Sequence, residues 1–274
     1  MISVIILTKN EEKDLPACLS SLDWCDDVHV VDSGSTDKTV ELAISKGARI
    51  TVNEFKSFGQ QRNFALDHLQ ITNDWILFLD ADEIATEKFR IEILGRIENV
   101  DDGLAGFYCC WKMILDDKWL KYSDNFPKWQ FRLMRKGRAR FTDFGHGQKE
   151  DKVAGGIDYI KEPYLHYGFS KGWTHWIDRH NKYSSAEALA RMSNRPPFRN
   201  IFSKHGSVRN PALKSWLGNL PGWPFLRFFF TYILKGGFLE GKPGFIYCAN
   251  MGYYEFLIKI KMRELKKASA HKLG

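Results

Sequence analysis

Three carboxylates follow one apolar run and could hold a cation. Asp80, Asp82 and Glu83 come directly after residues 75–79, whose sequence WILFL is typical of a buried strand. In open α/β sheets, ligands bind where the strands reach their carboxyl ends. Carboxylates this close repel one another unless they share a cation, hydroxyls or protons. Because carboxylate oxygens suit Mg²⁺ or Mn²⁺, which reach proteins together with phosphates, the first hypothesis is a metal–diphosphate site.

Other polar groups are expected at the same edge of the sheet. Asp32 ends a second apolar run and precedes the turn 33–36. Its carboxylate could accept from a base N–H or a ribose hydroxyl, or could simply cap the next helix. The segment 8–11 (TKNE) follows the first strand in the same way, and Arg62 near the start of a helical segment could contact a phosphate or lie on the surface. The combination is much more specific than any one of its members.

Alternating strands and helices are needed to position these groups. We expect an α/β fold with a mixed, mainly parallel sheet flanked by helices and joined by right-handed crossovers. Asn10 is the expected cap of the first helix. The apolar and amphipathic runs predict strands at 3–7, 28–31, 49–52 and 75–79, and helices at 10–22, 37–46, 58–69 and 86–98.

The pattern changes after residue 100, where the strands become short and are expected to be antiparallel or mixed. The predicted order is strands at 106–112, 118–122, 130–135 and 139–141, a helix at 171–191, a loop or hinge over 198–222, and amphipathic stretches at 225–234 and 245–260. We therefore predict a sheet domain over residues 1–170, with halves 1–100 and 101–170. A helical extension over 171–274 would follow it.

Charge is unevenly distributed along the chain. Residues 1–100 carry 10 Lys/Arg and 18 Asp/Glu, whereas residues 101–274 carry 30 and 15. A basic, aromatic C-terminal part indicates an anionic partner such as a membrane leaflet, a nucleic acid or an acidic glycan, or only a solvated basic face. The five cysteines form no C-x-x-C pair, which argues against disulfides or a zinc site and fits the cytosol. No apolar run reaches about 18 residues, so no membrane-spanning helix is predicted.

Four motifs resemble the family 2 glycosyltransferases of the GT-A fold over residues 1–135. They are, in order, residues 5–12 (IILTKNEE), 31–37 (VDSGSTD), 61–63 (QRN) and 80–83 (DADE). The later part resembles a bacterial subgroup that includes lipopolysaccharide-core β-glycosyltransferases. Its matching pieces are residues 132–135 (RLMR), 165–167 (LHY) and 236–241 (GGFLEG).

This resemblance implies which residues surround the nucleotide. Thr8, Asn10 or Glu11 would line the nucleotide pocket. Asp32 would meet the uracil or another base, and Arg62 would lie near the base or the diphosphate.

The resemblance also implies which residues surround the diphosphate. Asp80 would contact ribose or a metal-bound water, and Asp82 would ligate Mg²⁺ or Mn²⁺. His166 would approach the metal or the diphosphate from the C-terminal side. The alternative for His166 is a core histidine beside Tyr167.

A general base must take the proton of the acceptor hydroxyl, and a carboxylate can do so. The resembling subgroup typically has a His-Glu pair here, whereas His146 and Glu150 are three residues further apart. Glu150 is the favoured base, with Asp143, Asp124 and His146 as alternatives. His146 could instead bind the acceptor. The charged neighbours of Glu150 also allow an exposed loop.

The C-terminal stretches favour the surface of an anionic membrane. Residues 221–230 (PGWPFLRFFF) are aromatic and are interrupted by one arginine, and six Lys/Arg follow after residue 258 with one Glu opposing them. We expect a peripheral protein on the cytoplasmic face of the inner membrane. The alternative is that these helices pack on the sheet domain or on a second subunit.

Together these features predict a metal-dependent, inverting glycosyltransferase. It would move a sugar from a nucleotide-sugar, with a UDP-sugar favoured, to a lipid-linked glycan or lipopolysaccharide-core acceptor. Residues 1–100 would bind the donor and residues 101–170 the acceptor. One alternative is a sugar-phosphate nucleotidyltransferase, whose Gly-rich phosphate loop is missing after the first strand. Another is a non-catalytic basic adaptor, which leaves the acidic strand ends unexplained; no nucleic-acid partner is expected, and nothing in the sequence selects an oligomeric state.

Overall fold

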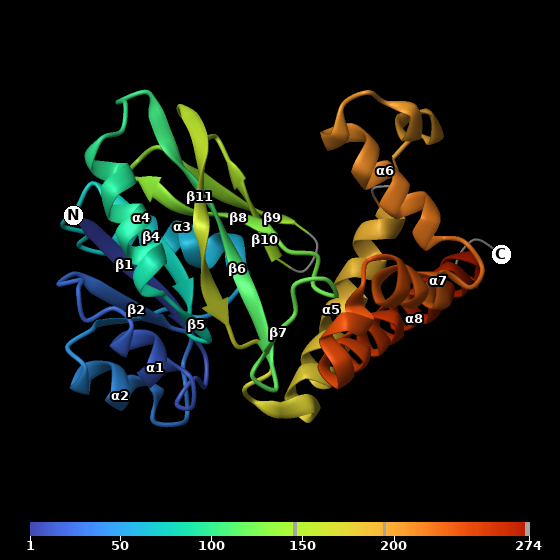
Figure 1. The fold of residues 1–274 in the computed structure, drawn as a ribbon, viewed down its shortest axis with the longest axis horizontal. Coiled ribbons are helices and arrows are strands. Elements are labelled where there is room, and N and C mark those ends of the chain that lie inside the picture. The colour runs from blue at the N-terminus through green and yellow to red at the C-terminus, as the bar shows by residue number, and fades with distance from the viewer. Residues whose placement is uncertain (145–146, 194–195, 272–274) are drawn as a thin grey trace. The chain divides into compact units, whose positions relative to one another are not determined.

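The structure is a computed structural model that describes residues 1–144, 147–193 and 196–271. It contains two compact units, and Figure 1 labels their elements. The sheet unit consists of residues 1–119 and 126–171. The helical unit consists of the chain from Gly172 onward together with Leu120–Asn125. A six-residue segment within the sheet-forming part of the sequence thus belongs to the C-terminal helices.

One mixed sheet forms the centre of the sheet unit. Four strands make its parallel half in the order β3-β2-β1-β4: β3 (Arg49–Val52), β2 (Val28–Asp32), β1 (Ile2–Thr8) and β4 (Trp75–Asp80). The path continues through β8 (Trp129–Arg135), β6 (Leu104–Leu115), β11 (Gly156–His166) and β5 (Glu83–Ile84), with β7 (Lys118–Trp119) beside β6. β8 is antiparallel to both neighbours, and β11 is parallel to β6. The predicted α/β class and mixed, mainly parallel sheet are confirmed.

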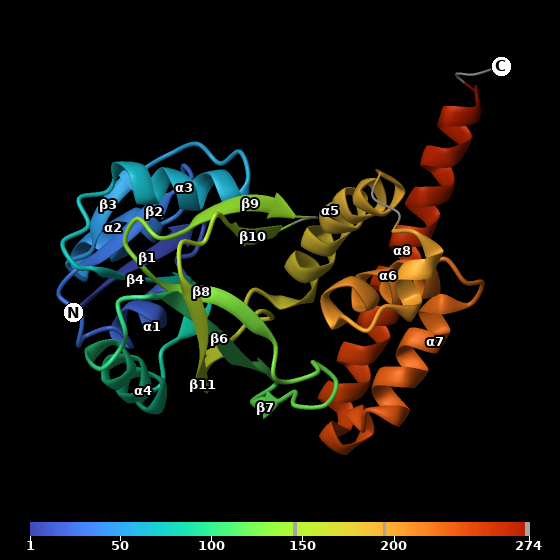
Figure 2. The same cartoon turned by 90° about the horizontal axis from the view of Figure 1, so that it is seen from above.

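Both faces of this sheet are covered, which explains the continuously apolar strands. Helices α1 (Leu15–Ser20), α2 (Thr39–Ser45) and α4 (Glu87–Glu98) pack on one face. Helix α3 (Phe58–His68) and the hairpin of β9 (Arg140–Phe144) and β10 (Gly147–Asp151) cover the other. Figure 2 shows α1 and α4 on one side and α3, β9 and β10 on the other. Adjacent residues alternate between the two cores, as Val30 and Val31 do.

The strand register brings the predicted polar groups to one edge. Thr8 is paired with Asp32 across β1 and β2, and Leu7 is paired with Asp80 across β1 and β4. All three strands therefore end at the same level. The expectation that these strand ends share the carboxyl edge is confirmed.

Several predicted elements are wrong. Asn10 does not cap a helix, because it adopts a left-handed backbone (φ 55°) and its side chain accepts from the backbone N–H of Thr36; helix α1 begins only at Leu15. Strand 118–122 ends at Trp119, and the long strand β11 was not predicted. Two charged residues followed by Pro163 interrupt the apolar pattern of β11.

The predicted loop over 198–222 is also wrong, since most of it is helical. It contains a 3₁₀ turn at Phe198–Phe202 and helix α6 (Gly206–Gly218), despite Pro211 inside the helix. Tertiary packing supports this helix, because Ala212 is fully buried and the Phe198 and Trp216 rings meet edge to face. The loop prediction failed because it relied on the Gly and Pro content of this segment, which tertiary packing overrides.

The rest of the helical unit surrounds its own small core. Its elements are α5 (Gly172–Ser193), α7 (Trp223–Phe229), a π turn (Phe230–Leu234), a 3₁₀ turn (Gly237–Glu240) and α8 (Gly241–His271). Ala188 of α5 packs on Tyr254 and Ile258 of α8, and Arg191 pairs with Glu255 at 2.8 and 3.1 Å. Among the described residues, no helix is long and apolar enough to cross a membrane.

Two carboxylates attach the segment Leu120–Asn125 to these helices. Buried Glu240 accepts from the backbone N–H groups of Tyr122 (2.6 Å) and Ser123 (3.2 Å). The Tyr247 hydroxyl donates to Asp124, which is also buried. Asp124 thus belongs to the helical unit and bonds to a tyrosine there.

Candidate functional site

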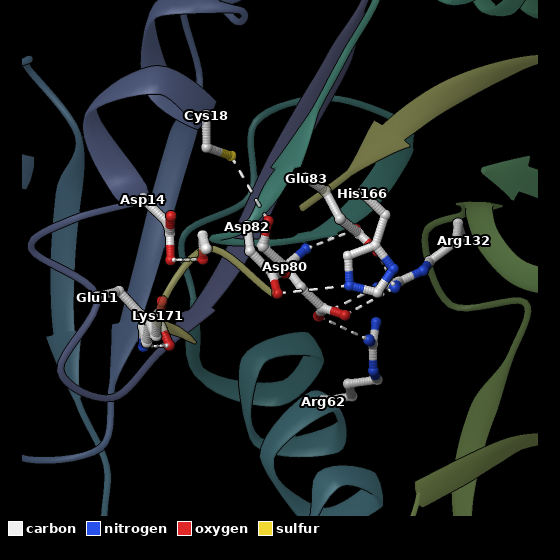
Figure 3. A network of polar contacts seen from close by, with 11 residues as sticks. Glu11, Asp14, Cys18, Arg62, Asp80, Asp82, Glu83, Arg132, His166 and Lys171 are labelled. Atoms are coloured by element: carbon white, nitrogen blue, oxygen red, sulfur yellow. Dashed lines mark hydrogen bonds and ion pairs between the residues drawn. The ribbon is translucent and has the colours of Figure 1, made fainter. Parts of the chain in front are cut away.

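Arg132 is the centre of the acidic group at the carboxyl edge. Its guanidinium lies 3.2 and 2.8 Å from the two carboxylate oxygens of Asp80, and 2.7 Å from Glu83. The second oxygen of Glu83 accepts from the backbone N–H of Asp80 at 2.8 Å. Figure 3 shows these groups converging from β4, β5 and β8. We call Arg62, Asp80, Asp82, Glu83, Arg132 and His166 the carboxyl-edge cluster.

A second arginine reaches Asp80 from the opposite face of the sheet. Arg62 of α3 is fully buried, with its guanidinium over the rings of Phe78 (4.7 Å) and Phe141 (5.4 Å). It lies 3.5 Å from Asp80, and in the amide orientation that satisfies both groups it donates to the Gln148 oxygen at 3.1 and 3.2 Å. Burial and the nearby Arg132 charge lower the pKa of Arg62 to about 10. The predicted surface arginine is thus excluded.

The two arginines shift the pKa values of the neighbouring carboxyl groups to different extents. Burial opposes ionisation of Asp80, but the charges of Arg132 and Arg62 outweigh it and hold its pKa well below the ordinary value. Burial raises the pKa of Glu83, and the negative charges of Asp80 and Asp82 raise it further, although Arg132 opposes them. Asp80 is therefore a fixed anion that is already paired. A bound cation would therefore need a carboxylate ligand other than Asp80.

Asp82 is the carboxylate of this group that lies beside a histidine. Its carboxylate lies 3.4 Å from His166 Nε2, and the two side chains are 16% and 21% exposed. Burial opposes protonation of His166, but Asp82 and the neighbouring carboxylates outweigh it and raise its pKa to about 9. The backbone N–H of Tyr167 donates to the Asp82 carbonyl and fixes this approach. The pair predicted from the sequence is therefore brought together.

The segment after β11 also reaches the β1–α1 loop. Lys171 lies 2.6 Å from the Glu11 carboxylate and donates to the carbonyl of Asn10 at 2.7 Å. The Ser170 hydroxyl donates to Asp14 at 2.7 Å. Burial raises the pKa of Glu11 to about 7 although Lys171 opposes it. Glu11 and Asp14 of this loop thus add negative charge near Asp82, and Figure 3 shows Lys171 against Glu11.

Asp32 is buried and bonded within its own turn. One oxygen accepts from the hydroxyls of Thr8 (2.9 Å) and Ser35 (2.5 Å), and the other from the N–H groups of Gly34 (2.9 Å) and Ser35 (2.7 Å). These four donors occupy the four lone-pair directions of a carboxylate. The turn-stabilising role is what the structure displays. Contact of Asp32 with a nucleotide base stays a prediction.

The base candidates lie in three different settings. Glu150 of β10 accepts from the Tyr108 hydroxyl at 2.6 Å and lines a hollow on the sheet. Asp143 of β9 accepts from the Gly59 N–H at the start of α3 at 3.0 Å, a contact that holds the hairpin on that helix. His146 lies outside the described residues. Asp124 is bonded to Tyr247 in the helical unit. Glu150 alone combines a carboxylate with an adjoining cavity.

Sequence reasoning missed the roles of Arg132, Glu83 and Lys171. Arg132 is an arginine in the middle of the apolar run WQFRLMR, and a buried arginine needs carboxylate partners. That signal could have predicted its pairing with the acidic group. Lys171 carried no comparable signal, because its contact with Glu11 joins residues far apart in sequence.

Comparisons with known proteins identify a family and several relatives. The model of the family described as glycosyl transferase family 2 matches residues 3–183. An uncharacterised glycosyltransferase of Rickettsia typhi is 28% identical over 278 residues, covering 98% of this chain and 88% of that protein. The lipopolysaccharide core biosynthesis glycosyltransferase LpsC of Rhizobium meliloti is 27% identical over 275 residues, covering 97% and 94%. These relatives match both units of the chain.

Among solved structures, the UDP complex of glucosyl-3-phosphoglycerate synthase from Mycobacterium tuberculosis is similar in part. It is 25% identical, with a TM-score of 0.36, and the match covers 41% of this chain and 44% of that one. The similarity extends over less than half of either protein.

Proposed function

Because the chain belongs to glycosyl transferase family 2, we propose that it transfers a sugar from a nucleotide-sugar bound at the carboxyl edge of the sheet unit. The observation that carries this proposal is that the two aspartates of the carboxyl-edge cluster have different partners. Asp80 pairs with two buried arginines, whereas Asp82 lies beside His166, and both of these side chains are partly exposed. A UDP-sugar is the donor that the motifs predict. Family membership favours neither the nucleotidyltransferase nor the adaptor.

The residues at this edge fit Mg²⁺ or Mn²⁺. Asp82 offers a carboxylate oxygen, and His166 would offer an imidazole nitrogen once the ion displaces the proton that its raised pKa holds there. Glu11 and Asp14 add negative charge nearby. The described residues hold no group of three or more His, Cys, Asp or Glu that could bind an ion alone. Mg²⁺ is commonly held by one or two carboxylates together with substrate phosphates. When bound here, the ion would neutralise the leaving diphosphate as a Lewis acid.

The remaining steps fall to the chain's own side chains. Arg132 and Arg62 keep Asp80 ionised and oriented, where it would accept from a ribose hydroxyl or a metal-bound water. Glu150 would take the acceptor's hydroxyl proton while that oxygen bonds to the anomeric carbon and the carbon–oxygen bond to the diphosphate breaks. This single displacement inverts the anomeric centre. Glu150 is preferred because it borders a cavity, whereas Asp143 holds the hairpin on α3.

The acceptor is proposed to be a lipid-linked glycan such as a lipopolysaccharide core. The relative LpsC, similar along almost its whole length, is named for lipopolysaccharide core biosynthesis. A lipid-linked acceptor would require the enzyme to work at a membrane. The helical unit carries a surface suited to that.

We define the apolar stripe as the exposed large side chains of α7, the π turn and the 3₁₀ turn. Its members are Phe225, Leu226, Phe229, Phe230, Ile233, Leu234, Phe238 and Leu239, with Phe225 79% exposed. Residues 221–239 contain no Asp or Glu, Lys235 and Lys242 are exposed beside the stripe, and Glu240 is buried. An extended apolar face bordered by lysines favours an anionic leaflet, at the cytoplasmic face of the inner membrane.

A nucleotide-sugar screen tests the transferase proposal. Thermal unfolding would be followed with UDP-, GDP-, ADP- and CMP-sugars, each with Mn²⁺, Mg²⁺ or a chelator. A donor at 100 times its Kd stabilises the folded state by about 2.7 kcal/mol, which raises Tm measurably. We expect one nucleoside class, with UDP favoured, to do so in a metal-dependent way and to release its nucleoside diphosphate. No shift and no release with any donor would overturn the proposal.

Vesicle sedimentation tests the membrane surface separately. We expect the full chain to bind vesicles containing 30% anionic lipid at low salt, and the double variant Phe225→Ser/Phe229→Ser to bind at least about tenfold more weakly. Ile91→Ser, at an exposed apolar site on α4, is the matched control and should bind normally. Equal binding by all three proteins would contradict a membrane role. If dimer dissociation accompanies the double substitution, the stripe is a subunit contact instead.

A further inference from the structure

A hollow with a volume of about 290 Å³ lies where the β9–β10 hairpin covers the edges of β6 and β8. Tyr108, Trp129, Phe144, Gln148 and Glu150 are among its lining residues. All belong to the sheet unit, on the same face as α3. The hollow lies outside the carboxyl-edge cluster and calls for its own explanation.

Exposed aromatic rings form one wall of this hollow and extend it. The Trp129 ring meets Tyr159 edge to face at 4.8 Å, and Tyr159 lies 5.4 Å from Tyr108. Trp129 is 37% exposed and Tyr159 42%, so large ring surfaces face solvent beside a concavity. Rings arranged this way usually receive a ligand, because exposed apolar area in a depression is costly to leave hydrated.

Polar groups complete the hollow. One oxygen of Glu150 accepts from the Tyr108 hydroxyl, which fixes the carboxylate, and the described residues supply no donor for the other. The amide oxygen of Gln130 is buried and has no partner among those residues. Lys149 contributes a cation to the lining. A ligand with an apolar face and a rim of hydroxyls would satisfy both the aromatic rings and the polar atoms. A quaternary ammonium would instead be repelled by the positive charge of Lys149.

The hollow adjoins the donor site through one side chain. Gln148 lines it and contacts Arg62, which reaches Asp80. Gln148 and Glu150 are two residues apart on β10 and so face the same side of that strand. A ligand in the hollow would thus lie next to groups that hold the donor.

We propose that this hollow is the subsite for a sugar ring of the acceptor glycan, which stacks on Trp129 and Tyr159 and bonds through its hydroxyls to Glu150 and Gln130. The inference rests on the proposed transferase function and names where its acceptor binds. The rings supply apolar contact with a rigid geometry, and the polar groups select orientation. Trp129 and Tyr159 would then be specificity-determining residues.

Saturation-transfer NMR with methyl glycosides of glucose, galactose, mannose and N-acetylglucosamine tests the subsite without knowledge of the natural acceptor. We expect at least one glycoside to bind the unmutated protein, and its signal to fall at least about fivefold in Trp129→Ala and Tyr159→Ala, the loss of about 1 kcal/mol of stacking. Ile91→Ala, exposed on the opposite face of the sheet, should bind normally. Choline is the control ligand and should give no signal.

The outcomes separate this inference from the transferase proposal. Donor-induced thermal stabilisation should be unchanged in Trp129→Ala and Tyr159→Ala, which also shows that these variants fold. Equal glycoside signals in all variants, choline binding, or no glycoside binding would each overturn the subsite while leaving donor binding intact. If the unmutated chain bound no donor, that result would instead overturn the transferase proposal.

Discussion

Two aspartates lie at opposite edges of the parallel half of the sheet and are held in different ways. Asp80 ends β4 at the carboxyl edge, whereas Asp27 precedes β2 at the amino edge. Asp27 accepts from the Ser3 hydroxyl, from the N–H and hydroxyl of Thr72 (3.0 and 2.7 Å), and from His29 (2.9 Å). Exposed Arg49 also pairs with it. We call these five residues the amino-edge cluster.

The difference lies in what each cluster leaves unsatisfied. Hydroxyl, backbone N–H and imidazole donors surround Asp27, with the guanidinium of Arg49 on the exposed side. The carboxyl-edge cluster contains two buried arginines, and several of its buried donor atoms have no partner among the described residues: Arg62 Nη1, Arg132 Nε and His166 Nδ1. Unsatisfied buried polar groups cost free energy, so a fold retains them where a ligand completes them. The amino-edge cluster serves stability, and we propose that the carboxyl-edge cluster serves binding and catalysis.

The sharpest test of this contrast is Asp82→Ala. We expect transferase activity to fall roughly 10²–10³-fold, because the carboxylate that would hold the cation opposite the leaving diphosphate would be lost. The free energy of unfolding should change less than activity does, since the substitution removes the ion pair with His166 but also relieves repulsion of Glu83 by Asp82. Nucleoside diphosphate release and denaturant unfolding measure the two effects. Asp102→Ala, whose side chain is 95% exposed, is the control. Normal turnover in Asp82→Ala would contradict the binding and catalytic role proposed for the carboxyl-edge cluster.

Asp27→Asn should have the opposite effect. Replacing this carboxylate disrupts a buried network and should lower the free energy of unfolding by about 3 kcal/mol. Activity per folded molecule should stay normal, because Asp27 lies at the other end of the strands. Urea unfolding and donor titration below the transition measure these quantities. If activity fell more than stability, the amino-edge cluster would not be purely structural.

Acid should lower the free energy of unfolding by protonating Asp27 in the amino-edge cluster. Burial opposes ionisation of Asp27, but hydrogen bonds from Ser3 and Thr72 outweigh it and lower its pKa from 3.8 to about 2. A folded pKa below the unfolded value stabilises the protein above about pH 4, and this stabilisation is lost as pH falls toward 2. The loss should be roughly 2 kcal/mol.

The variant Asp27→Asn isolates that contribution. The difference in unfolding free energy between wild type and variant should shrink as pH falls from 5 to 2. Urea titrations at several pH values measure it. A difference that stays constant over this range would show that Asp27 does not titrate in this window.

His166→Gln should give the smallest effect of the four. If His166 assists Asp82, activity should fall about 10–100-fold, with partial recovery at higher Mn²⁺ concentration. The alternative is a histidine that only packs in the core, and then stability would fall while activity per folded molecule stayed normal. Activity over a Mn²⁺ titration, together with Tm, separates the two.

Local spacing explains the successes of sequence interpretation. The strand ends at Thr8, Asp32 and Asp80 follow from continuous apolar runs whose lengths suit buried parallel strands. Family membership followed from motifs that are short and contiguous, and the chain retains them unbroken. Failures occurred where local preference and packing disagreed, as in α6 with its internal Pro211 and in the turn of Asn10.

What the sequence by itself determined is therefore the α/β class, the family and the carboxylates at the carboxyl edge. Only the tertiary structure decided that Asp80 is neutralised by Arg132 and Arg62 while Asp82 stays beside His166. It alone placed Glu150 against Tyr108 in a hollow and joined Leu120–Asn125 to the C-terminal helices. The physical reason is range: periodicity governs neighbours in the chain, whereas charge pairing depends on which distant strands and helices the topology brings together.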